Sequence, residues 1–210
     1  RKLILATSKD IRVLLVKIAD RLHNMRTIKA LGKEEKMKRI SQETMEIYAP
    51  LADRMGMHRI RDELEDLSFE ILNNDARSLI QKRLDQIKFD KKDIFNHISN
   101  ELRMLLKKNN IETEIYGREK TPFSIWRKLQ KKRVSLEQIT DIIGFRIIVN
   151  NVDDCYKTLG IFHKEWNCIP GKFKDYISSP KINGYKSIHT SIIGSYKKPI
   201  EIQIRTKNMH

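Results

Sequence analysis

Cysteine is nearly absent from this chain of 210 residues, and long hydrophobic runs are absent altogether. Cys155 and Cys168 have no cluster of histidines beside them, which argues against a disulfide framework and a structural zinc site. We expect both thiols to be buried in a reducing compartment. The longest apolar runs, such as 13–16 and 147–149, fall far short of a membrane span, and no signal-peptide pattern opens the chain. The sequence therefore predicts a cytoplasmic protein without a membrane partner.

Internal repeats and low-complexity tracts are also absent, and 40% hydrophobic residues suffice for a core, which argues against simple disorder. Charge is unbalanced instead: 42 lysines and arginines against 27 acidic residues give a net charge of +15. This excess favours a polyanionic partner, such as nucleotide phosphate, nucleic acid or an anionic membrane surface, without choosing among them. Because the chain starts at Arg1 and stops soon after a predicted strand, we expect both ends to be cut from a longer protein.

The first half of the chain shows helical periodicity throughout. Apolar residues recur at helical spacing over 10–31, and further helices are predicted over 34–48, 51–72 and, as a pair, 76–108. Pro50 is expected to separate the second helix from the third, and a soft break near 89–90 to divide the last pair. Residues 1–110 are thus predicted to be all helical.

The pattern changes after Asn109 and Asn110. Strands are predicted over 112–116, 142–149, 187–193 and 200–205, with helices over 124–133 and 153–166 between them. The predicted fold class is α+β, an all-helical N-terminal half followed by a mixed sheet.

A candidate phosphate site lies where the first strand ends and the next helix begins, with Pro122 placed for the first turn. Four side chains there can converge on one spot: Arg118, Lys120, Ser124 and Lys128. Ser124 and Lys128 are four residues apart and share a helix face, and the helix N-terminus adds backbone donors and a positive dipole end. A triphosphate needs such a pocket. The alternative, a solvated charged helix face, is equally compatible with this motif alone.

Two acidic residues accompany the predicted strands. Asp141 precedes an otherwise apolar strand, where a lone aspartate is often only a cap, and alternation places Glu201, Gln203 and Arg205 on one face of the last strand. Carboxylates on neighbouring strands beside a phosphate pocket suit Mg²⁺, which prefers oxygen ligands and bridges to substrate phosphates. The pairing of Asp141 with Glu201 is a hypothesis.

The segment 170–190 mixes glycine and proline turns with lysines, two tyrosines and a histidine. These residues can hold phosphates and stack a nucleotide base. Tyr185, which follows Asn183 and Gly184, is expected to be the stacking ring. The alternative is a charged surface loop with a core tyrosine, which for Tyr176 is as good an interpretation.

Five ordered motifs closely resemble the synthetase domain of the RelA/SpoT family: Tyr-Gly-Arg-Glu-Lys-Thr-Pro-Phe-Ser-Ile (116–125), Asp-Ile-Ile-Gly-Phe-Arg (141–146), Phe-Lys-Asp-Tyr-Ile (173–177), Asn-Gly-Tyr-Lys-Ser-Ile-His-Thr (183–190) and Glu-Ile-Gln-Ile-Arg-Thr (201–206). The resemblance implies a fold related to nucleotidyltransferases of the polymerase β type. It also implies a GTP pyrophosphokinase of the stringent response, in which the 3′-hydroxyl of GDP or GTP attacks the β-phosphate of ATP, AMP leaves and (p)ppGpp forms.

The same resemblance implies roles for individual residues. ATP would be bound by Arg118, Lys120, Ser124 and Lys128. Asp141 would hold Mg²⁺, and Glu201 would assist the metal or activate the hydroxyl. The guanosine nucleotide would contact Tyr185, Lys174, Lys181, Asn183 and His189. Where bifunctional members carry Arg-x-Lys-Asp, this chain has Lys172 before Phe-Lys-Asp, which keeps the charge but loses the planar guanidinium.

The first half resembles the end of the family's HD-type hydrolase domain, in the segments 16–27 and 44–56. In the family Asp20 would be a Mn²⁺ ligand, but no histidine here is followed by aspartate, so the Mn²⁺ site is expected to be incomplete and hydrolase activity lost. The expected domains are a partial HD domain (1–75), a helical linker (76–110) and the synthetase domain (111–210). Without their partners, the first helices should expose apolar faces and favour self-association.

Three alternatives stay open: a fragment of a (p)ppGpp 3′-pyrophosphohydrolase, a basic nucleic-acid-binding module, and a folded but inactive split-gene product. The binding module explains the charge but not the ordered acids, since carboxylates repel a phosphate backbone. Ribosome association is expected only through regulatory domains beyond His210, and oligomerisation is left open.

Overall fold

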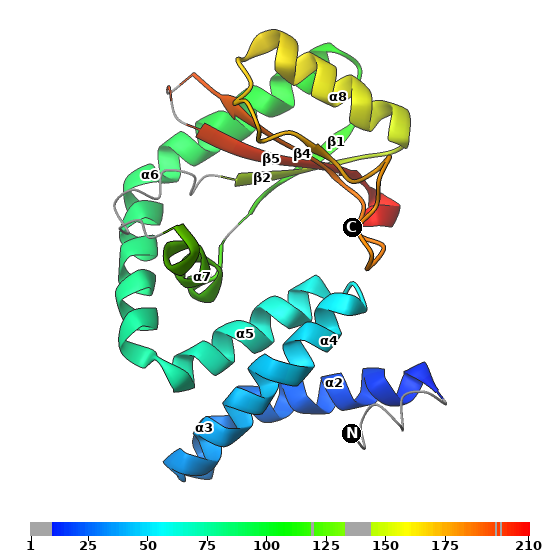
Figure 1. Ribbon diagram of the computed structural model, residues 1–210. Helices are drawn as coiled ribbons and strands as arrows, with labels where there is room; N and C mark the ends of the chain where they lie inside the picture. Colours follow the sequence, from blue (N-terminus) through cyan, green and yellow to red (C-terminus); the bar gives the residue numbers. More distant parts are fainter. Residues whose placement is uncertain (1–9, 119, 133–143, 196, 198) are drawn as a thin grey trace. The chain divides into compact units, whose positions relative to one another are not determined.

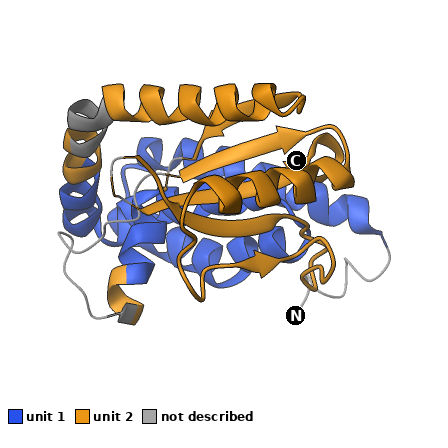
Figure 2. Ribbon diagram, turned by 90° about the horizontal axis from the view of Figure 1, so that it is seen from above, with its two compact units in different colours: residues 1–81, 121–128 blue, residues 82–120, 129–210 orange. Residues whose placement is uncertain are grey.

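The computed structural model describes residues 10–118, 120–132, 144–195, 197 and 199–210, without the side chains of 87–92 and 132. Its contacts divide the chain into two compact units (Figure 2). Unit 1 comprises residues 1–81 and 121–128, and unit 2 comprises residues 82–120 and 129–210.

Unit 1 is helical. Its elements are α2 (Ile11–Arg26), the 3₁₀ turn η1 (Ile28–Leu31), α3 (Glu34–Glu43), the π-helix η2 (Thr44–Tyr48), α4 (Ala49–Arg54), α5 (His58–Leu72), and the first turns of α6 (Asn74–Lys108) and α7 (Pro122–Lys132) (Figure 1). The Asp10 side chain caps α2 by accepting from the Arg12 backbone N–H. A core that includes Ile18, Met25 and Leu64 holds these helices together.

Two sequence predictions about unit 1 are wrong. Pro50 does not separate two helices: η2 runs directly into α4, and Pro50 lies in the first turn of α4, where a missing N–H does least harm. The predicted helix 51–72 is broken instead at Gly56, whose φ of 73° favours glycine, so that α4 ends and α5 starts at His58.

Unit 2 contains a five-stranded sheet in the order β1-β2-β5-β4-β3. Its strands are β1 (Thr113–Gly117), β2 (Gly144–Val149), β3 (Lys174–Asp175), β4 (Ile188–Ile193) and β5 (Pro199–Thr206), followed by the short 3₁₀ helix η4 (Lys207–Met209). The β2–β5 pair is parallel and the other pairs are antiparallel, so the sheet is mixed, as predicted. The predicted fold class, a helical half followed by a mixed sheet, is confirmed.

One face of this sheet is covered by α6 and by α8 (Val152–Glu165) (Figure 1). From β5 it buries Ile200, Ile202 and Ile204, which alternate along the strand with Glu201, Gln203 and Arg205. Because the isoleucines fill the core on this face, the polar residues lie on the opposite one.

The predicted break near 89–90 is wrong, since α6 is one helix of 35 residues. The two-residue strand β3 was not predicted at all. Cys155 is buried as expected, but Cys168 is exposed, so that expectation is wrong for one thiol. On α2, Ile11 and Val16 are 64% and 68% exposed, in line with the expected apolar face, while self-association stays a prediction. Among the described helices, none is long and apolar enough to cross a membrane.

Candidate functional site

The polar face of the unit 2 sheet carries Glu201 and His189, two of the residues singled out from the sequence. Strand pairing places His189 of β4 opposite Gln203 of β5, and Ser191 opposite Glu201. On the other side of β5, Gly144 of β2 pairs with Glu201. The polar residues of β4 and β5 therefore lie side by side on the face away from α6 and α8.

Glu201 is held between two cations. One carboxylate oxygen lies 2.7 Å from Nη1 of Arg118, and the other lies 3.2 Å from Nζ of Lys120. Burial raises the pKa of Glu201, but Arg118 and Lys120 outweigh it, and the pKa ends below its ordinary value. The backbone N–H of Arg118 donates to the carbonyl of Gly144 at 2.8 Å, which fixes Arg118 beside the start of β2. An ionised carboxylate and two cations are thus brought together in unit 2.

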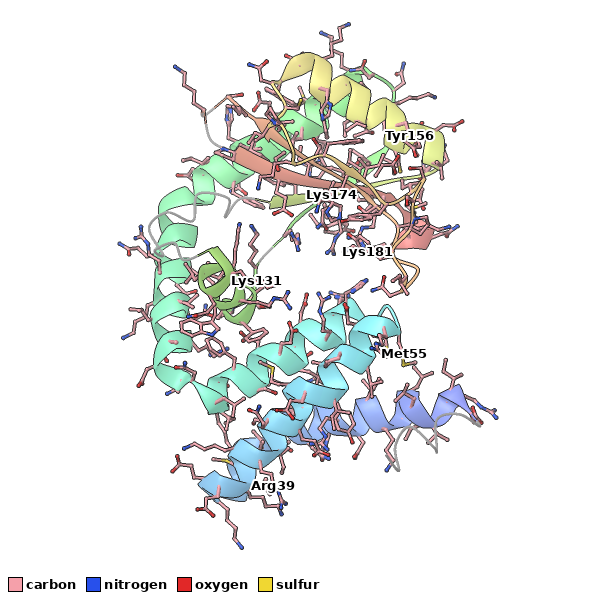
Figure 3. All side chains as sticks on the ribbon, viewed as in Figure 1. Arg39, Met55, Lys131, Tyr156, Lys174 and Lys181 are labelled. Carbon is pink, nitrogen blue, oxygen red and sulfur yellow. The ribbon has the colours of Figure 1, made fainter. Side chains whose placement is uncertain are left out.

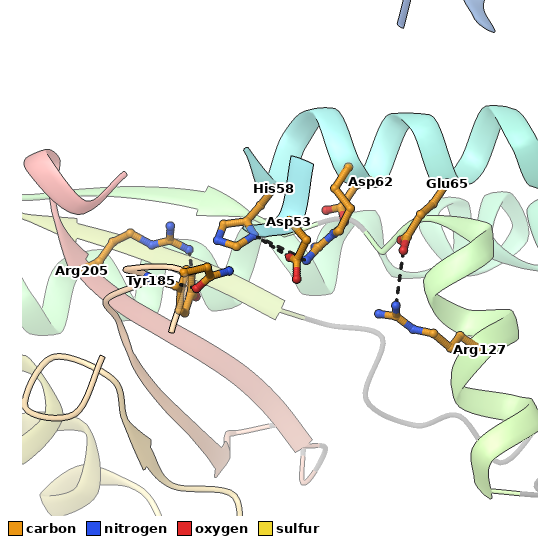
Figure 4. A network of polar contacts seen from close by, with 9 residues as sticks. Asp53, His58, Asp62, Glu65, Arg127, Tyr185 and Arg205 are labelled. Atoms are coloured by element: carbon orange, nitrogen blue, oxygen red, sulfur yellow. Dashed lines mark hydrogen bonds and ion pairs between the residues drawn. The ribbon is translucent and has the colours of Figure 1, made fainter. Parts of the chain in front are cut away.

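Tyr185 is the centre of a second polar group. Its hydroxyl lies 2.7 Å from Nε2 of His189. The same hydroxyl accepts from Nη2 of Arg205 at 3.4 Å (Figure 4). The ammonium of Lys181 lies 5.0 Å from the Tyr185 ring centroid and 4.8 Å from that of Tyr176. Aromatic rings and cations are thus close together, as the sequence pattern suggested.

His189 is uncharged at neutral pH. Burial lowers its pKa to about 4; Glu201 opposes this shift, while Arg118, Lys181 and Arg205 add to it. A neutral imidazole has one donor and one acceptor nitrogen. Nε2 lies within hydrogen-bond distance of the Tyr185 hydroxyl, and it accepts from or donates to this hydroxyl according to the tautomer.

The turn before β4 has a defined shape. The Asn183 side chain accepts from the Tyr185 backbone N–H at 3.2 Å, and the Gly184 N–H donates to the Lys181 carbonyl at 2.8 Å. Gly184 has φ 74°, which a side chain would strain. Lys174 is exposed on β3 opposite His189 in the register, and both Lys174 and Lys181 extend from the segment between α8 and β4 (Figure 3).

Ser124 and Lys128 lie on α7, in the part that belongs to unit 1, whereas Arg118 and Lys120 belong to unit 2. Convergence of the four side chains therefore stays a prediction. The Ser124 hydroxyl donates to the Thr121 carbonyl at 2.8 Å, and its backbone N–H donates to the Thr121 hydroxyl at 3.2 Å. Ser124 thus takes part in capping α7.

The position of α7 within unit 1 is set by α5. Asp66 accepts from the Phe123 backbone N–H at 3.3 Å, and the Phe69 ring lies 5.5 Å from the Phe123 ring. Glu65 binds Arg127 at 3.4 Å (Figure 4), although burial raises the pKa of this carboxyl. None of these α5 residues was singled out from the sequence.

Of the residues expected to bind a metal, the structure describes Glu201 and Asp20 but not Asp141. Asp141 lies outside the described residues, and the described part of the chain holds no group of three or more potential metal ligands. Glu201 offers an ionised oxygen donor of the kind Mg²⁺ requires. Asp20 is exposed on α2, where it accepts from Asn24 at 3.2 Å.

Arg205 is a residue to which the sequence patterns assigned no role, although alternation placed it on the face of Glu201. Its side chain is buried and donates to Gln203 and to Tyr185. The sequence did not indicate that Arg205 is buried, because the alternation of a strand does not show which residues cover its polar face.

Comparison with known proteins shows which family this sequence resembles. Residues 117–210 match a profile described as "Region found in RelA / SpoT proteins", and residues 1–58 match one described as "HD domain". GTP pyrophosphokinase rsh of Brucella melitensis is 50% identical over 209 residues, which is 100% of this chain and 28% of that relative. The chain belongs to the RelA/SpoT family.

Other RelA/SpoT relatives are named as hydrolases or as bifunctional synthase/hydrolases. The bifunctional (p)ppGpp synthase/hydrolase SpoT of Escherichia coli is 44% identical over 100% of this chain and 30% of its own length. The guanosine-3′,5′-bis(diphosphate) 3′-pyrophosphohydrolase of Haemophilus influenzae is also 44% identical, over 100% of this chain and 31% of that relative. The small alarmone synthetase 2 of Bacillus subtilis aligns with 60% of this chain and 73% of its own, at 30% identity and a TM-score of 0.47. The chain spans less than a third of the length of the curated relatives named here.

Proposed function

We propose that this chain transfers pyrophosphate from ATP to the 3′-hydroxyl of GDP or GTP, in the (p)ppGpp metabolism of the stringent response. The observation that carries the proposal is Glu201, an ionised carboxylate held by Arg118 and Lys120 on the polar face of the sheet. Membership of the RelA/SpoT family supports it. The nucleotide substrates are cytoplasmic, so the proposal includes that compartment.

On the donor side, Arg118 and Lys120 are proposed to bind the ATP phosphates, together with Ser124 and Lys128. Phosphate oxygens compete with Glu201 for the two cations, because charge-assisted bonds to phosphate are strong. Binding ATP would then loosen the ion pairs of Glu201 and leave its carboxylate to accept the proton of the attacking hydroxyl.

On the acceptor side, the Tyr185 ring is proposed to stack on the guanine, with Lys174, Lys181, Asn183 and His189 around the nucleotide. The two lysines supply charge for its phosphates, and the neutral His189 supplies a hydrogen-bonding ring nitrogen. The 3′-oxygen then forms a bond to the β-phosphorus of ATP, the bond from that phosphorus to the AMP oxygen breaks, and the hydroxyl proton passes to Glu201.

Mg²⁺ is the proposed cofactor, with Glu201 and Asp141 as its ligands. Bound there, it would neutralise phosphate charge and orient the transferring group. We further propose the domain limits 1–75, 76–110 and 111–210. Ribosome contact is proposed only through segments that the longer relatives contain, and oligomerisation is left to measurement.

The test is to incubate the chain with ATP, GDP or GTP and Mg²⁺ and to separate the nucleotides by anion exchange. AMP and (p)ppGpp should appear in equal amounts. Glu201→Gln should lower the turnover rate by about 10²–10⁴-fold, the usual contribution of a general base. Glu165→Gln, the same change at an exposed residue at the end of α8, should keep full activity. Folded protein that forms no AMP with any divalent metal would refute the proposal.

A second candidate function is hydrolysis of (p)ppGpp, favoured by the HD match over residues 1–58. Against it, Asp20 is the only HD metal ligand that the sequence resemblance identified. We therefore expect no pyrophosphate release from (p)ppGpp with Mn²⁺. Sustained release, abolished by Asp20→Asn, would show that the hydrolase site is functional.

A further inference from the structure

Arg205 is a buried cation that has no carboxylate partner among the residues the structure describes. Its side chain is on β5 and is 5% exposed. Within the described residues no acidic group forms an ion pair with it, and its Nε has no hydrogen-bond partner. Burying an unpaired charge is costly, so this arginine does not serve the fold as an ordinary core residue would.

The bonds that Arg205 does make lead to the Tyr185 side chain. Nη2 donates to the Gln203 side-chain oxygen at 3.1 Å and to the Tyr185 hydroxyl at 3.4 Å, while Nη1 donates to the Met209 carbonyl at 3.5 Å. The guanidinium carbon also lies 5.3 Å from the centroid of the Tyr185 ring. A planar guanidinium can contact a ring and bind two acceptors at once, which an ammonium does not do.

The Tyr185 ring is consequently fixed from several directions. Its hydroxyl lies between His189 and Arg205, and the ring of Tyr176 meets it edge-on at 5.9 Å. One anchor at the hydroxyl leaves the ring free to swing about that point, whereas two anchors define its plane. Removing Arg205 takes away one of these contacts to the hydroxyl and the guanidinium beside the ring.

We propose that Arg205 is a positioning residue for the acceptor nucleotide, acting through Tyr185 by holding its ring ready for a base to stack. The proposal rests on the proposed function and extends it to a residue that the family motifs gave no role. A ring ordered before binding loses less conformational entropy when the nucleotide arrives, and ordering one side chain corresponds to about threefold to tenfold in affinity.

The test compares the KM for the acceptor with the KM for ATP. Arg205→Met should raise the KM for GDP about threefold to tenfold and leave the KM for ATP within about twofold. Arg205→Lys, which keeps the charge but not the planar group, should fall between Arg205→Met and the wild type. Arg103→Met, the same change at an exposed arginine on α6, should alter neither KM.

Tyr185→Phe distinguishes positioning through Tyr185 from a purely structural role of Arg205. It removes the hydroxyl but keeps the ring, so Arg205→Lys should change the KM for GDP less in that background than in the wild type, and the two changes should be non-additive. Additive effects, or equal rises in both KM values, would overturn the proposal. Arg205→Lys carries the test if Arg205→Met does not fold.

Calorimetric titration of GDP separates this inference from the proposed function. A wild-type chain that forms no AMP refutes the proposed function, yet weaker GDP binding by Arg205→Lys would still support the positioning role. Unchanged GDP affinity in Arg205→Lys, or no GDP binding by the wild type, overturns the inference.

Discussion

The ring of Phe95 on α6 lies directly over the backbone of Gly117, the last residue of β1. A β-carbon built at Gly117 would lie 2.3 Å from Cζ of Phe95, so the contact would have to open by about 1.2 Å to reach an ordinary separation of ~3.5 Å. The Phe95 ring is stacked on the fully buried Phe145 at 4.5 Å, which blocks its retreat on that side. Overpacking of this kind costs about 1–3 kcal/mol, and the gain of about 0.4–1 kcal/mol from a less flexible unfolded chain offsets part of it.

Gly117→Ala is therefore expected to lower the free energy of unfolding by about 1–2 kcal/mol, which corresponds to a fall in Tm of about 2–8 °C for a chain of this size. Calorimetry and urea unfolding measure both quantities. Gly160→Ala is the matched control, because Gly160 lies in α8 with nothing within 4 Å of the new carbon, and this variant should be stabilised by up to about 1 kcal/mol.

The contact with Phe95 can be tested separately from glycine's backbone freedom. Phe95→Leu shortens the side chain and should relieve most of the Gly117→Ala penalty, with a coupling energy of about 0.5–3 kcal/mol between the two changes. Additivity of the two variants, or a stabilised Gly117→Ala, would refute this account of the glycine.

Three further outcomes are expected. Burial lowers the pKa of His189 to about 4 in the folded chain, against 6.5 for the free side chain, so between these values only the unfolded chain takes up the proton. The free energy of unfolding should therefore not depend on this group above pH 6.5 and should fall by up to about 3 kcal/mol as the pH drops toward 4. Urea unfolding at several pH values should show this fall, and His189→Gln should remove its contribution to the pH dependence. Cys168 is exposed while burial raises the pKa of Cys155 to about 11, so a thiol reagent should modify one cysteine in the native chain and the second only after unfolding; equal rates would contradict the burial of Cys155. Asp66→Ala removes the acceptor for the Phe123 N–H and a salt bridge to Arg77 at 2.7 Å, and should destabilise unit 1 by about 1–3 kcal/mol in urea unfolding. An unchanged midpoint would show that the other contacts between α5 and α7, the aromatic ones and the Glu65–Arg127 pair, suffice to hold α7.

The strands of unit 2 could be predicted because their apolar residues alternate or run together with few interruptions. β3 could not, since two residues have no period and this strand is defined only by its pairing with β4. The break predicted inside α6 came from a polar stretch, but residues 74–108 contain neither glycine nor proline, so nothing there interrupts the backbone hydrogen bonds. The break predicted at Pro50 was wrong because proline fits the first turn of a helix as well as it ends one, and Pro50 lies in the first turn of α4.

The candidate site was predictable where a motif gathers its residues within a few positions. Arg118 and Lys120 are two residues apart, and the sequence placed both beside the end of a strand. Their ion pairs with Glu201, some eighty positions later, depend on a parallel strand pairing that no local pattern reveals. The role of Arg205 was not predicted for a related reason, because its partner Tyr185 comes from a turn in another part of the chain.

The sheet order also governs when unit 2 can form. β5, the last strand along the chain, is the central one, and both β2 and β4 depend on it for a neighbour. A polypeptide emerging from the ribosome can complete the helices of residues 10–72 from local contacts, but the two halves of this sheet, β1–β2 and β3–β4, have no common partner until residues 199–206 have been synthesised. Glu201 lies in that strand, so the proposed chemistry depends on the strand that joins the two halves, and a nascent chain that stops short of β5 lacks both the joined sheet and the carboxylate.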